Sequence, residues 1–252
     1  MSKTLDLNCD MGESYGAWPM GNDAAVLPLV SSANIACGFH GGDPGTMRKT
    51  VALALDNGVA LGAHPSLPDL GGFGRRVMQI SPQEAYDMVV YQVGALAGVA
   101  ASQGARLHHV KAHGALYNMA AKDAALARAI CTAVRDVDHE LIVYGLAGSA
   151  WITEARKLDL SCAQEVFADR SYQDDGSLTP RTQPGAMITD VDQAVAQVLQ
   201  MVQQDSVTSV SGKTVMLTAD TLCIHGDQPN ALPFASAIRQ ALQAAGIVIT
   251  PP

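Results

Sequence analysis

Short apolar stretches recur along the chain, and each is followed by a polar cluster and then by a segment with helical periodicity. Buried parallel strands are short apolar runs, and their alternation with helices indicates repeated βα units. Seven stretches have this character: Leu5–Cys9, Asn34–Cys37, Val59–Ala63, Leu107–Ala112, Leu141–Gly145, Leu160–Phe167 and Thr221–His225. The pattern predicts an α/β fold, a seven-stranded parallel (βα) barrel of the irregular TIM type. An eight-stranded barrel and an open doubly wound sheet are the alternatives.

Several of the intervening helices have recognisable ends. Ser81-Pro82-Gln83-Glu84 has the serine, proline and glutamate of a capping box, and this helix should end near Gly104. Another helix should begin at Asp43-Pro44, where Asp43 suits the N-cap position, and end near Asn57-Gly58. We expect two further helices, from Thr189 to about Gln204 and from Asn230 to about Ala245.

Two segments depart from this rhythm. Residues 168–187 form a long stretch without helix or strand periodicity, and such stretches in compact domains are binding loops, lids or disordered segments. Residues 207–218 have the pattern of a β-hairpin that turns at Ser211-Gly212. Because no linker or low-complexity tract divides the chain, we expect one domain over residues 1–252, with the hairpin as an insertion.

The composition excludes several classes of function. The chain has 252 residues, of which 48% are hydrophobic, and this suffices for one barrel of the usual size. Its net charge of -8 argues against nucleic-acid binding, which needs clustered Lys and Arg. No apolar run approaches the roughly 18–20 residues that span a bilayer, and the N-terminus lacks the apolar core of a signal peptide. We therefore expect a cytoplasmic protein whose five cysteines are reduced thiols.

Polar side chains are predicted to gather inside the barrel. Residues two apart on a strand share a face, and helices cover the outside, so the polar set should face inward. Most of these residues lie where strands end, the region in which barrel enzymes build active sites. The small ones should leave room for a ligand. The inward set comprises Asp6, Asn8, Asp10, Asn34, Ala36, Gly38, His40, Ala60, Gly62, His64, His109, Lys111, His113, Glu165, Phe167, Asp169, Cys223, His225 and Asp227.

Structural interpretations compete with this functional one. A lone strand-end histidine is more often a satisfied structural group than a ligand, and Asp6 could tie down the barrel floor. The joint occurrence of His40, His64, His113 and His225 nevertheless favours a functional site. The chain has no phosphate loop, no dinucleotide fingerprint and no nucleophile elbow. Acid–base or metal-assisted hydrolysis suits this inventory better than an acyl-enzyme mechanism.

Several motifs carry a family resemblance. They are LDLNCDMGES, ANIACGFHGGDP, AHPSLPDLGGFGRR, VKAHGALYN, EVFADRSY and DTLCIHGDQP, which span residues 5 to 231 in order. In these motifs the chain closely resembles the LamB/YcsF family, whose members are the A subunits of prokaryotic ATP-dependent 5-oxoprolinases. The resemblance implies a barrel like those of deacetylases and glycoside hydrolases. It also implies conversion of 5-oxo-L-proline to L-glutamate with ATP hydrolysis, in a complex with subunits B and C that would bind, or help to bind, ATP.

This resemblance suggests roles for many of the inward residues and for Glu13 and Arg170. A lactam is a poor electrophile, and phosphorylation of its carbonyl oxygen would let water attack the ring carbon. We predict that Asp10 or Glu13 activates this water and that Lys111 and Arg170 hold the substrate carboxylate or phosphate. Protons would be exchanged by His40, His64, His113 and His225. The remaining substrate contacts would come from Asn8, Glu165, Asp169, Asp227 and His225.

Two other functions are alternatives. The first is a metal-dependent deacetylase of N-acetylated sugars, in which Asp10, His40 and His64 would hold a divalent metal. The second is a non-catalytic subunit that only presents 5-oxoproline to its partners. The sequence leaves open whether the chain also forms a homo-oligomer.

Overall fold

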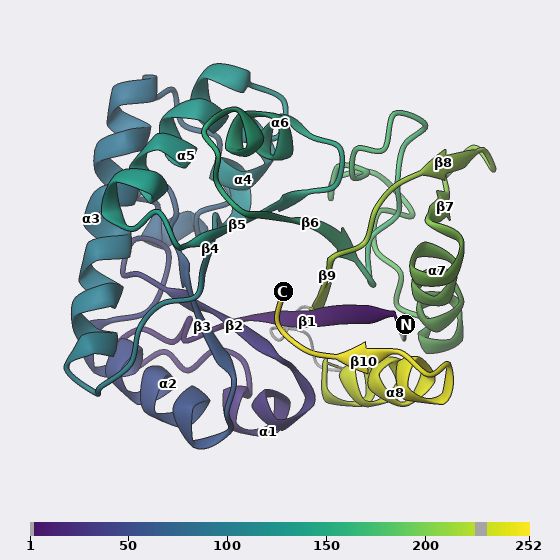
Figure 1. Ribbon diagram of the computed structural model, residues 1–252, viewed down its shortest axis with the longest axis horizontal. Helices are drawn as coiled ribbons and strands as arrows, with labels where there is room; N and C mark the ends of the chain where they lie inside the picture. The colour runs from purple at the N-terminus through teal and green to yellow at the C-terminus, as the bar shows by residue number, and fades with distance from the viewer. Residues whose placement is uncertain (1–2, 225–230) are drawn as a thin grey trace.

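The computed structural model describes residues 3–224 and 231–252, and it contains a closed barrel of seven parallel strands surrounded by helices (Figure 1). The strands follow one another around the barrel, and β9 closes it by pairing with both β6 and β1. This closure confirms the predicted seven-stranded barrel and excludes an open sheet. The barrel strands are β1 (Thr4–Met11), β2 (Ser32–Ala36), β3 (Ala60–His64), β4 (His109–Lys111), β5 (Ile142–Leu146), β6 (Cys162–Phe167) and β9 (Thr221–Ile224).

Three short strands lie outside the barrel ring. β7 (Ser206–Thr208) and β8 (Thr214–Met216) pair in antiparallel register and form a hairpin between α7 and β9. β10 (Val248–Ile249) pairs in parallel with the first residues of β1, ahead of the part of β1 that pairs with β2. The chain thus returns to its first strand at its end.

The helices surround the barrel, and their caps follow the sequence signals. Ser81 and Glu84 form the predicted capping box of α3, and Asp43 accepts hydrogen bonds from the first turn of α2. The α7 helix begins two residues later than predicted, because Asp190 is its N-cap. No helix in the described part of the chain is long and apolar enough to cross a membrane. The helices are α1 (Asp23–Val26), η1 (Leu27–Leu29), α2 (Pro44–Asp56), η2 (Leu70–Gly72), α3 (Pro82–Ala101), α4 (Gly114–Ala120), α5 (Ala124–Val137), α6 (Ala150–Lys157), α7 (Val191–Gln204) and α8 (Ala231–Ala244).

The barrel has an apolar outside and a polar inside. Leu5, Leu7 and Cys9 of β1 belong to the apolar core that also contains buried side chains of the helices. Asp6 and Asn8 alternate with them and are buried among polar groups. The Asp6 carboxylate accepts hydrogen bonds from the hydroxyls of Ser31, Ser32 and Thr221, so it ties together the barrel floor. Every cysteine is a free thiol.

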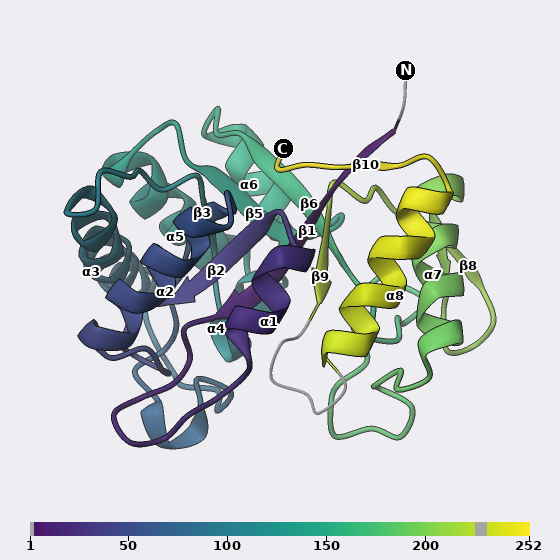
Figure 2. The same ribbon diagram turned by 90° about the horizontal axis from the view of Figure 1, so that it is seen from below.

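Long loops extend from one end of the barrel. The loops that follow β1, β3 and β6 all lie at this end, beyond the carboxyl ends of the strands (Figure 2). The loop at residues 168–187, predicted to be irregular, contains only isolated bridges, between Arg170 and Met187 and between Tyr172 and Leu178. The strand ends and these loops enclose the cavity described next.

Candidate active site

A cavity of about 700 Å³ opens at the carboxyl end of the barrel. Asp10, Lys111 and His113 line it from the strand ends, while α4 and the loops after β3 and β6 contribute further residues. Barrel enzymes gather their reactive groups at this end, because the loops after the strands converge there. The cavity is therefore the candidate active site.

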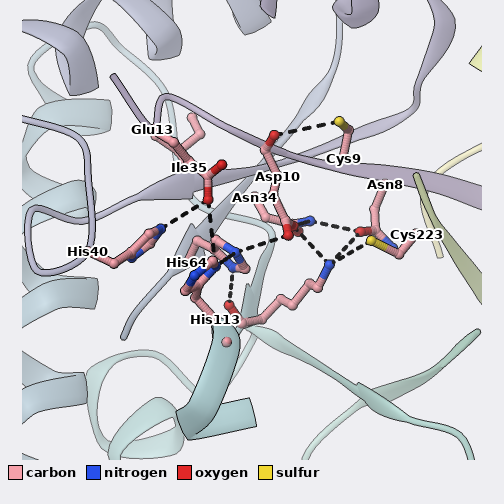
Figure 3. Close-up of polar contacts among 12 residues, drawn as sticks. Asn8, Cys9, Asp10, Glu13, Asn34, Ile35, His40, His64, His113 and Cys223 are labelled. Carbon is pink, nitrogen blue, oxygen red and sulfur yellow. Dashed lines mark hydrogen bonds and ion pairs between the residues drawn. The ribbon is translucent and has the colours of Figure 1, made fainter. Parts of the chain in front are cut away.

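A buried ion-pair network surrounds Lys111 beneath the cavity. The Lys111 ammonium lies 2.8 Å from Oδ1 of Asp10 and 2.9 Å from Oε1 of Glu165. It also donates to Oδ1 of Asn8 and to Sγ of Cys223, each at 3.1 Å. These five residues come from four strands, β1, β4, β6 and β9, and Figure 3 shows the contacts to Asn8, Asp10 and Cys223. One ammonium group thus joins strands on opposite sides of the barrel.

The ionised groups of this network affect the pKa of Lys111. Burial alone would lower the pKa of Lys111, because desolvation disfavours an ammonium ion. The negative charges of Asp10 and Glu165 outweigh that effect, and the pKa of Lys111 is raised well above its ordinary value. Asp10 keeps 12% of its side chain exposed, against 3% for Lys111 and 0% for Glu165. Asp10 is therefore the member of the network best placed to meet a ligand.

A glutamate and three histidines form a second cluster, which lies beside Asp10 (Figure 3). Nε2 of His40 lies 3.1 Å from Oε1 of Glu13, and Nδ1 of His113 lies 3.0 Å from Nε2 of His64. The rings of His40 and His113 are stacked, with their centroids 3.8 Å apart. Nε2 of His64 lies 3.3 Å from Oδ2 of Asp10, which joins the two clusters. The structure thus brings together Asp10, Glu13, His40, His64 and His113, whereas His225, which was also predicted to exchange protons, lies outside the described residues.

Backbone carbonyls determine which nitrogens of two histidines carry hydrogen. Nδ1 of His64 donates to the carbonyl oxygen of Lys111 at 2.7 Å, and Nε2 of His113 donates to that of Phe73 at 2.8 Å. Burial lowers the pKa of His113 well below its ordinary value, and the nearby His40 and His64 add to this effect. Neutral His113 therefore presents the lone pair of Nδ1 to Nε2 of His64. This pair of nitrogens is suited to a shared proton or a metal ion.

The cluster fits a divalent metal in part. Zn²⁺ binds imidazole nitrogens and carboxylate oxygens at about 2.0–2.2 Å, and nitrogens 3.0 Å apart satisfy that geometry. His64 and His113 also have the hydrogen bonds that orient metal-bound histidines. Nδ1 of His40, in contrast, is buried without a hydrogen-bond partner among the described residues. Glu13, His64 and His113 therefore fit a metal best, with Asp10 beside them, whereas the sequence suggested Asp10, His40 and His64.

Arg170 supports the loop that forms one wall of the cavity. It is buried, and its guanidinium donates to the carbonyl oxygens of Thr179 and Ala186, which lie farther along the same loop. Burial, with the positive charge of Arg181, lowers the pKa of Arg170 to about 10, so the group is a cation at neutral pH. Arg170 and Arg181 both line the cavity. This wall is suited to an anionic group of a ligand.

The remaining predicted residues fall into two groups. Asp169 is buried, and its negative charge opposes the lowering of the Arg170 pKa. His225 and Asp227 lie outside the described residues. Their predicted substrate contacts stay predictions.

Some features of the site were not predicted. The room expected beside Gly62 is filled by the ring of His109, because an added β-carbon would lie 2.0 Å from Nε2 of that histidine. Tyr117 of α4 lines the cavity, yet nothing in its sequence context marks it, because the strand alternation says nothing about helix residues. Asn34 and His109 were expected to face inward, but the alternation did not show that they lie next to each other and that Asn34 contacts Asp10.

Comparisons with proteins of known sequence identify close relatives. The A subunit of 5-oxoprolinase from Bordetella pertussis is 77% identical over 249 residues, which cover 99% of each chain. The A subunit of 5-oxoprolinase from Bacillus subtilis is 58% identical over 246 residues, which cover 98% of this chain and 96% of the relative.

Comparisons with solved structures agree with these relatives. The lactam utilization protein from Thermus thermophilus has a TM-score of 0.94 at 49% identity, with 99% of this chain and 100% of that one covered. A family 4 carbohydrate esterase from Streptomyces lividans has a TM-score of 0.53 at 11% identity, with 98% and 91% covered, and shares the fold alone. The model of the LamB/YcsF family matches residues 5–252. The chain therefore belongs to the LamB/YcsF family.

Proposed function

We propose that this chain is the lactam-opening subunit of an ATP-dependent 5-oxoprolinase, which converts 5-oxo-L-proline to L-glutamate. Its relatives are named as 5-oxoprolinase A subunits and as a lactam utilization protein, and these names support this class of substrate. The observation that carries the proposal is that Asp10, Lys111 and three members of the histidine–glutamate cluster, Glu13, His64 and His113, line one cavity. Amide hydrolysis requires a general base, a proton donor and positive charge near the reacting groups, and this cavity offers candidates for each.

The role of ATP follows from the chemistry of the lactam. An amide carbonyl is a poor electrophile, and phosphorylation of its oxygen would create a leaving group and let water attack the ring carbon. The sequence contains no phosphate loop and no dinucleotide fingerprint. We therefore assign ATP binding to the partner subunits B and C or to an interface with them. The word subunit in the names of the relatives supports such a complex.

We assign the activation of water to Asp10. Its Oδ1 accepts hydrogen bonds from Asn34 and Lys111, whereas its Oδ2 lies beside His64 at the cavity. Water would lose a proton to this carboxylate as its oxygen attacks the ring carbon. When the ring C–N bond breaks, a proton from the imidazoles of the cluster would reach the nitrogen and give the amino group of γ-glutamyl phosphate. A second water would then hydrolyse this acyl phosphate and release inorganic phosphate and glutamate. Glu13, which is paired with His40, is the second candidate for the base.

Anion recognition is assigned to the loop wall. Arg170 is a cation that lines the cavity, and it would hold the substrate carboxylate. The Lys111 ammonium is already surrounded by Asp10, Glu165 and Asn8. We therefore infer that Lys111 serves mainly to pair with Asp10 and Glu165 at the cavity and does not itself hold the substrate carboxylate.

Reconstitution tests this function. The chain should be combined with subunits B and C, and ATP-dependent glutamate formation from 5-oxo-L-proline should be measured, with an N-acetylated sugar as the control substrate. Asp10→Asn should lower the rate by about 10²–10⁴-fold, the usual contribution of a general base. Ser102→Ala, on the surface at the end of α3, is the matched control and should keep the rate. Normal glutamate formation by the Asp10→Asn complex would instead indicate a non-catalytic, substrate-presenting role.

Metal-dependent hydrolysis is the second candidate, because of the cluster of Glu13, His40, His64 and His113. A bound metal would act as a Lewis acid and lower the pKa of a coordinated water. Metal analysis of protein purified without chelators should then find one divalent ion per chain, and Glu13→Gln should lose it. A metal-free complex that forms glutamate would exclude this candidate. Release of acetate from the control sugar would favour a deacetylase.

A further inference from the structure

A layer of side chains beneath the cavity contacts Asp10 through Asn34. Asn34 donates from Nδ2 to Oδ1 of Asp10 at 2.8 Å and to Oδ1 of Asn8 at 2.7 Å. The Oδ1 atom of Asn34 is 2.8 Å from Nε2 of His109. Neither Asn34 nor His109 is among the residues that line the cavity. Any effect of His109 on a ligand must therefore pass through other side chains.

These contacts allow only one orientation of the Asn34 amide. A reversed amide would place its oxygen against the oxygens of Asp10 and Asn8 and its NH₂ group against Nε2 of His109. Because an amide oxygen can only accept, Nε2 of His109 must carry a hydrogen and donate it. His109 thus donates to the amide oxygen and helps to hold the amide in this orientation, and the amide in turn holds one oxygen of Asp10.

His109 itself is held in a fixed place. The side chain is completely buried, and its ring is stacked on Tyr144 with centroids 4.0 Å apart and planes 11° apart. It also occupies the space beside Gly62, where no other residue type would leave room for it. A donor with so little freedom can define the position of its acceptor.

We propose that His109 is a positioning residue, which orients the Asp10 carboxylate toward the cavity through the Asn34 amide. The inference rests on the proposed function, in which Asp10 activates water. Without the His109 donor, Asn34 can rotate, and Lys111 remains the main partner of Oδ1 of Asp10. A small misplacement of a catalytic group slows the chemical step more than it weakens binding. Loss of the donor should therefore lower kcat and leave KM nearly unchanged.

Two variants separate this role from core packing. His109→Phe keeps an aromatic ring against Tyr144 but has no donor, whereas His109→Gln keeps a donor near the position of Nε2. His139→Gln changes an exposed histidine between α5 and β5 and is the matched control. Each variant is assayed in the complex with subunits B and C for glutamate formation, and its thermal midpoint is measured in parallel.

The expected result is a fall in kcat of about tenfold or more for His109→Phe, with KM within about twofold of the wild-type value. His109→Gln should recover most of the loss, and His139→Gln should match the wild type. In the Asp10→Asn background, His109→Phe should cause no further loss. Equal losses for the Phe and Gln variants, a loss confined to KM, or wild-type kcat in His109→Phe would each overturn the proposal.

A second readout does not depend on the proposed activity. The side-chain NH₂ group of Asn34, held by Asp10 and Asn8, should exchange its hydrogens slowly in nuclear magnetic resonance spectra. His109→Phe should speed this exchange, and His109→Gln should restore it. Unchanged exchange in the Phe variant would contradict the positioning role even if the complex forms no glutamate. Wild-type glutamate formation by Asp10→Asn, together with the expected exchange, would instead overturn only the catalytic role of Asp10. If His109→Phe does not fold, Asn34→Ala replaces it in the kinetic test and should show the same fall in kcat.

Discussion

At the scale of single residues, the interior of this barrel depends on polar groups that satisfy one another. Lys111 has two carboxylates within 3 Å, and they neutralise its ammonium in a buried position. Buried charges are costly unless they are paired, so removal of one member leaves the others uncompensated. The consequences can be measured by substitution.

Lys111→Met should leave the carboxylates of Asp10 and Glu165 without their cation. We expect the free energy of unfolding in urea to fall by about 3–5 kcal/mol. The double variant Lys111→Met/Glu165→Gln should recover part of this loss, because only one of the two carboxylates then remains. If the double variant is no more stable than Lys111→Met, the loss of stability does not arise from an unpaired Glu165 carboxylate.

The Lys111 ammonium also makes the free energy of unfolding depend on pH. The pKa of Lys111 is higher in the folded chain than in the unfolded chain. The stability that the charged ammonium contributes is therefore complete below the unfolded pKa of about 10.4 and is lost as the pH rises through the folded pKa. The stability difference between the wild type and Lys111→Met/Glu165→Gln should therefore stay constant from about pH 6 to about pH 9. Urea unfolding at several pH values provides the measurement.

Gly62→Ala tests the close approach of His109 to β3. The added β-carbon would lie 2.0 Å from Nε2 of His109, so the ring must move. We expect the free energy of unfolding to fall by about 1–3 kcal/mol, as for other overpacked cores. Gly94→Ala in α3, where the β-carbon meets nothing within 4 Å, is the control and should be neutral or stabilising. Equal effects of the two substitutions would contradict this packing.

At the scale of elements, the loop after β3 is tied to the histidine cluster. Its Phe73 carbonyl accepts the hydrogen of His113, and Asp69 holds the loop by accepting hydrogen bonds from the Gly72 amide and the Arg76 side chain. The Arg76 hydrogen bond is the main reason that the pKa of Asp69 is lowered. The conformation of this loop and the orientation of His113 are therefore coupled.

Acidification should loosen this loop. The pKa of Asp69 is lower in the folded chain than in the unfolded chain. The stability that its carboxylate contributes is therefore present above the unfolded pKa of about 3.9 and is lost as the pH falls through the folded pKa. Hydrogen exchange of the Gly72 amide, corrected for its intrinsic rate, should accelerate over that acidic range. In Asp69→Asn the amide should already exchange faster at neutral pH, with no further acid-dependent change from this group. If the Gly72 amide of Asp69→Asn exchanges as slowly as in the wild type, the Asp69 carboxylate does not hold this loop.

At the scale of the whole molecule, the charge of the cavity opposes the charge of the chain. The net charge is -8, yet among the described residues five cations line the cavity against two carboxylates, those of Asp10 and Glu13. The cations are Arg75, Lys111, Lys122, Arg170 and Arg181. An anionic ligand is thus attracted locally by a protein that is acidic overall.

This distribution predicts how a ligand should bind. In calorimetry, 5-oxo-L-proline should bind more tightly than 2-pyrrolidinone, which lacks the carboxylate. Its Kd should rise as the salt concentration rises from about 0.05 M to about 0.5 M, because ions screen charges near solvent. Arg181→Gln should weaken binding, whereas Arg128→Gln, on α5 and outside the cavity lining, should not. Equal affinity for the two ligands would argue against carboxylate recognition.

The sequence by itself determined the barrel, because the patterns that predict strands, helices and caps are local. Apolar runs, caps such as Ser81 and Asp43, and alternation along β1 each depend on neighbouring residues only. Once seven parallel strands close into a barrel, every second side chain along each strand points into the barrel. Asp10, His64 and Lys111 could therefore be placed at one centre before any distance was known.

Only the tertiary structure decided how these side chains pair. Strand register determines that Asn34 lies beside Asp10 and Gly62 beside His109, and no local pattern contains that register. Side-chain size then determines that His109 fills the room expected for a ligand. The same holds for His40, which contacts Glu13 rather than Asp10. Pairing depends on distances between strands far apart in the chain, and these distances exist only when the barrel has closed.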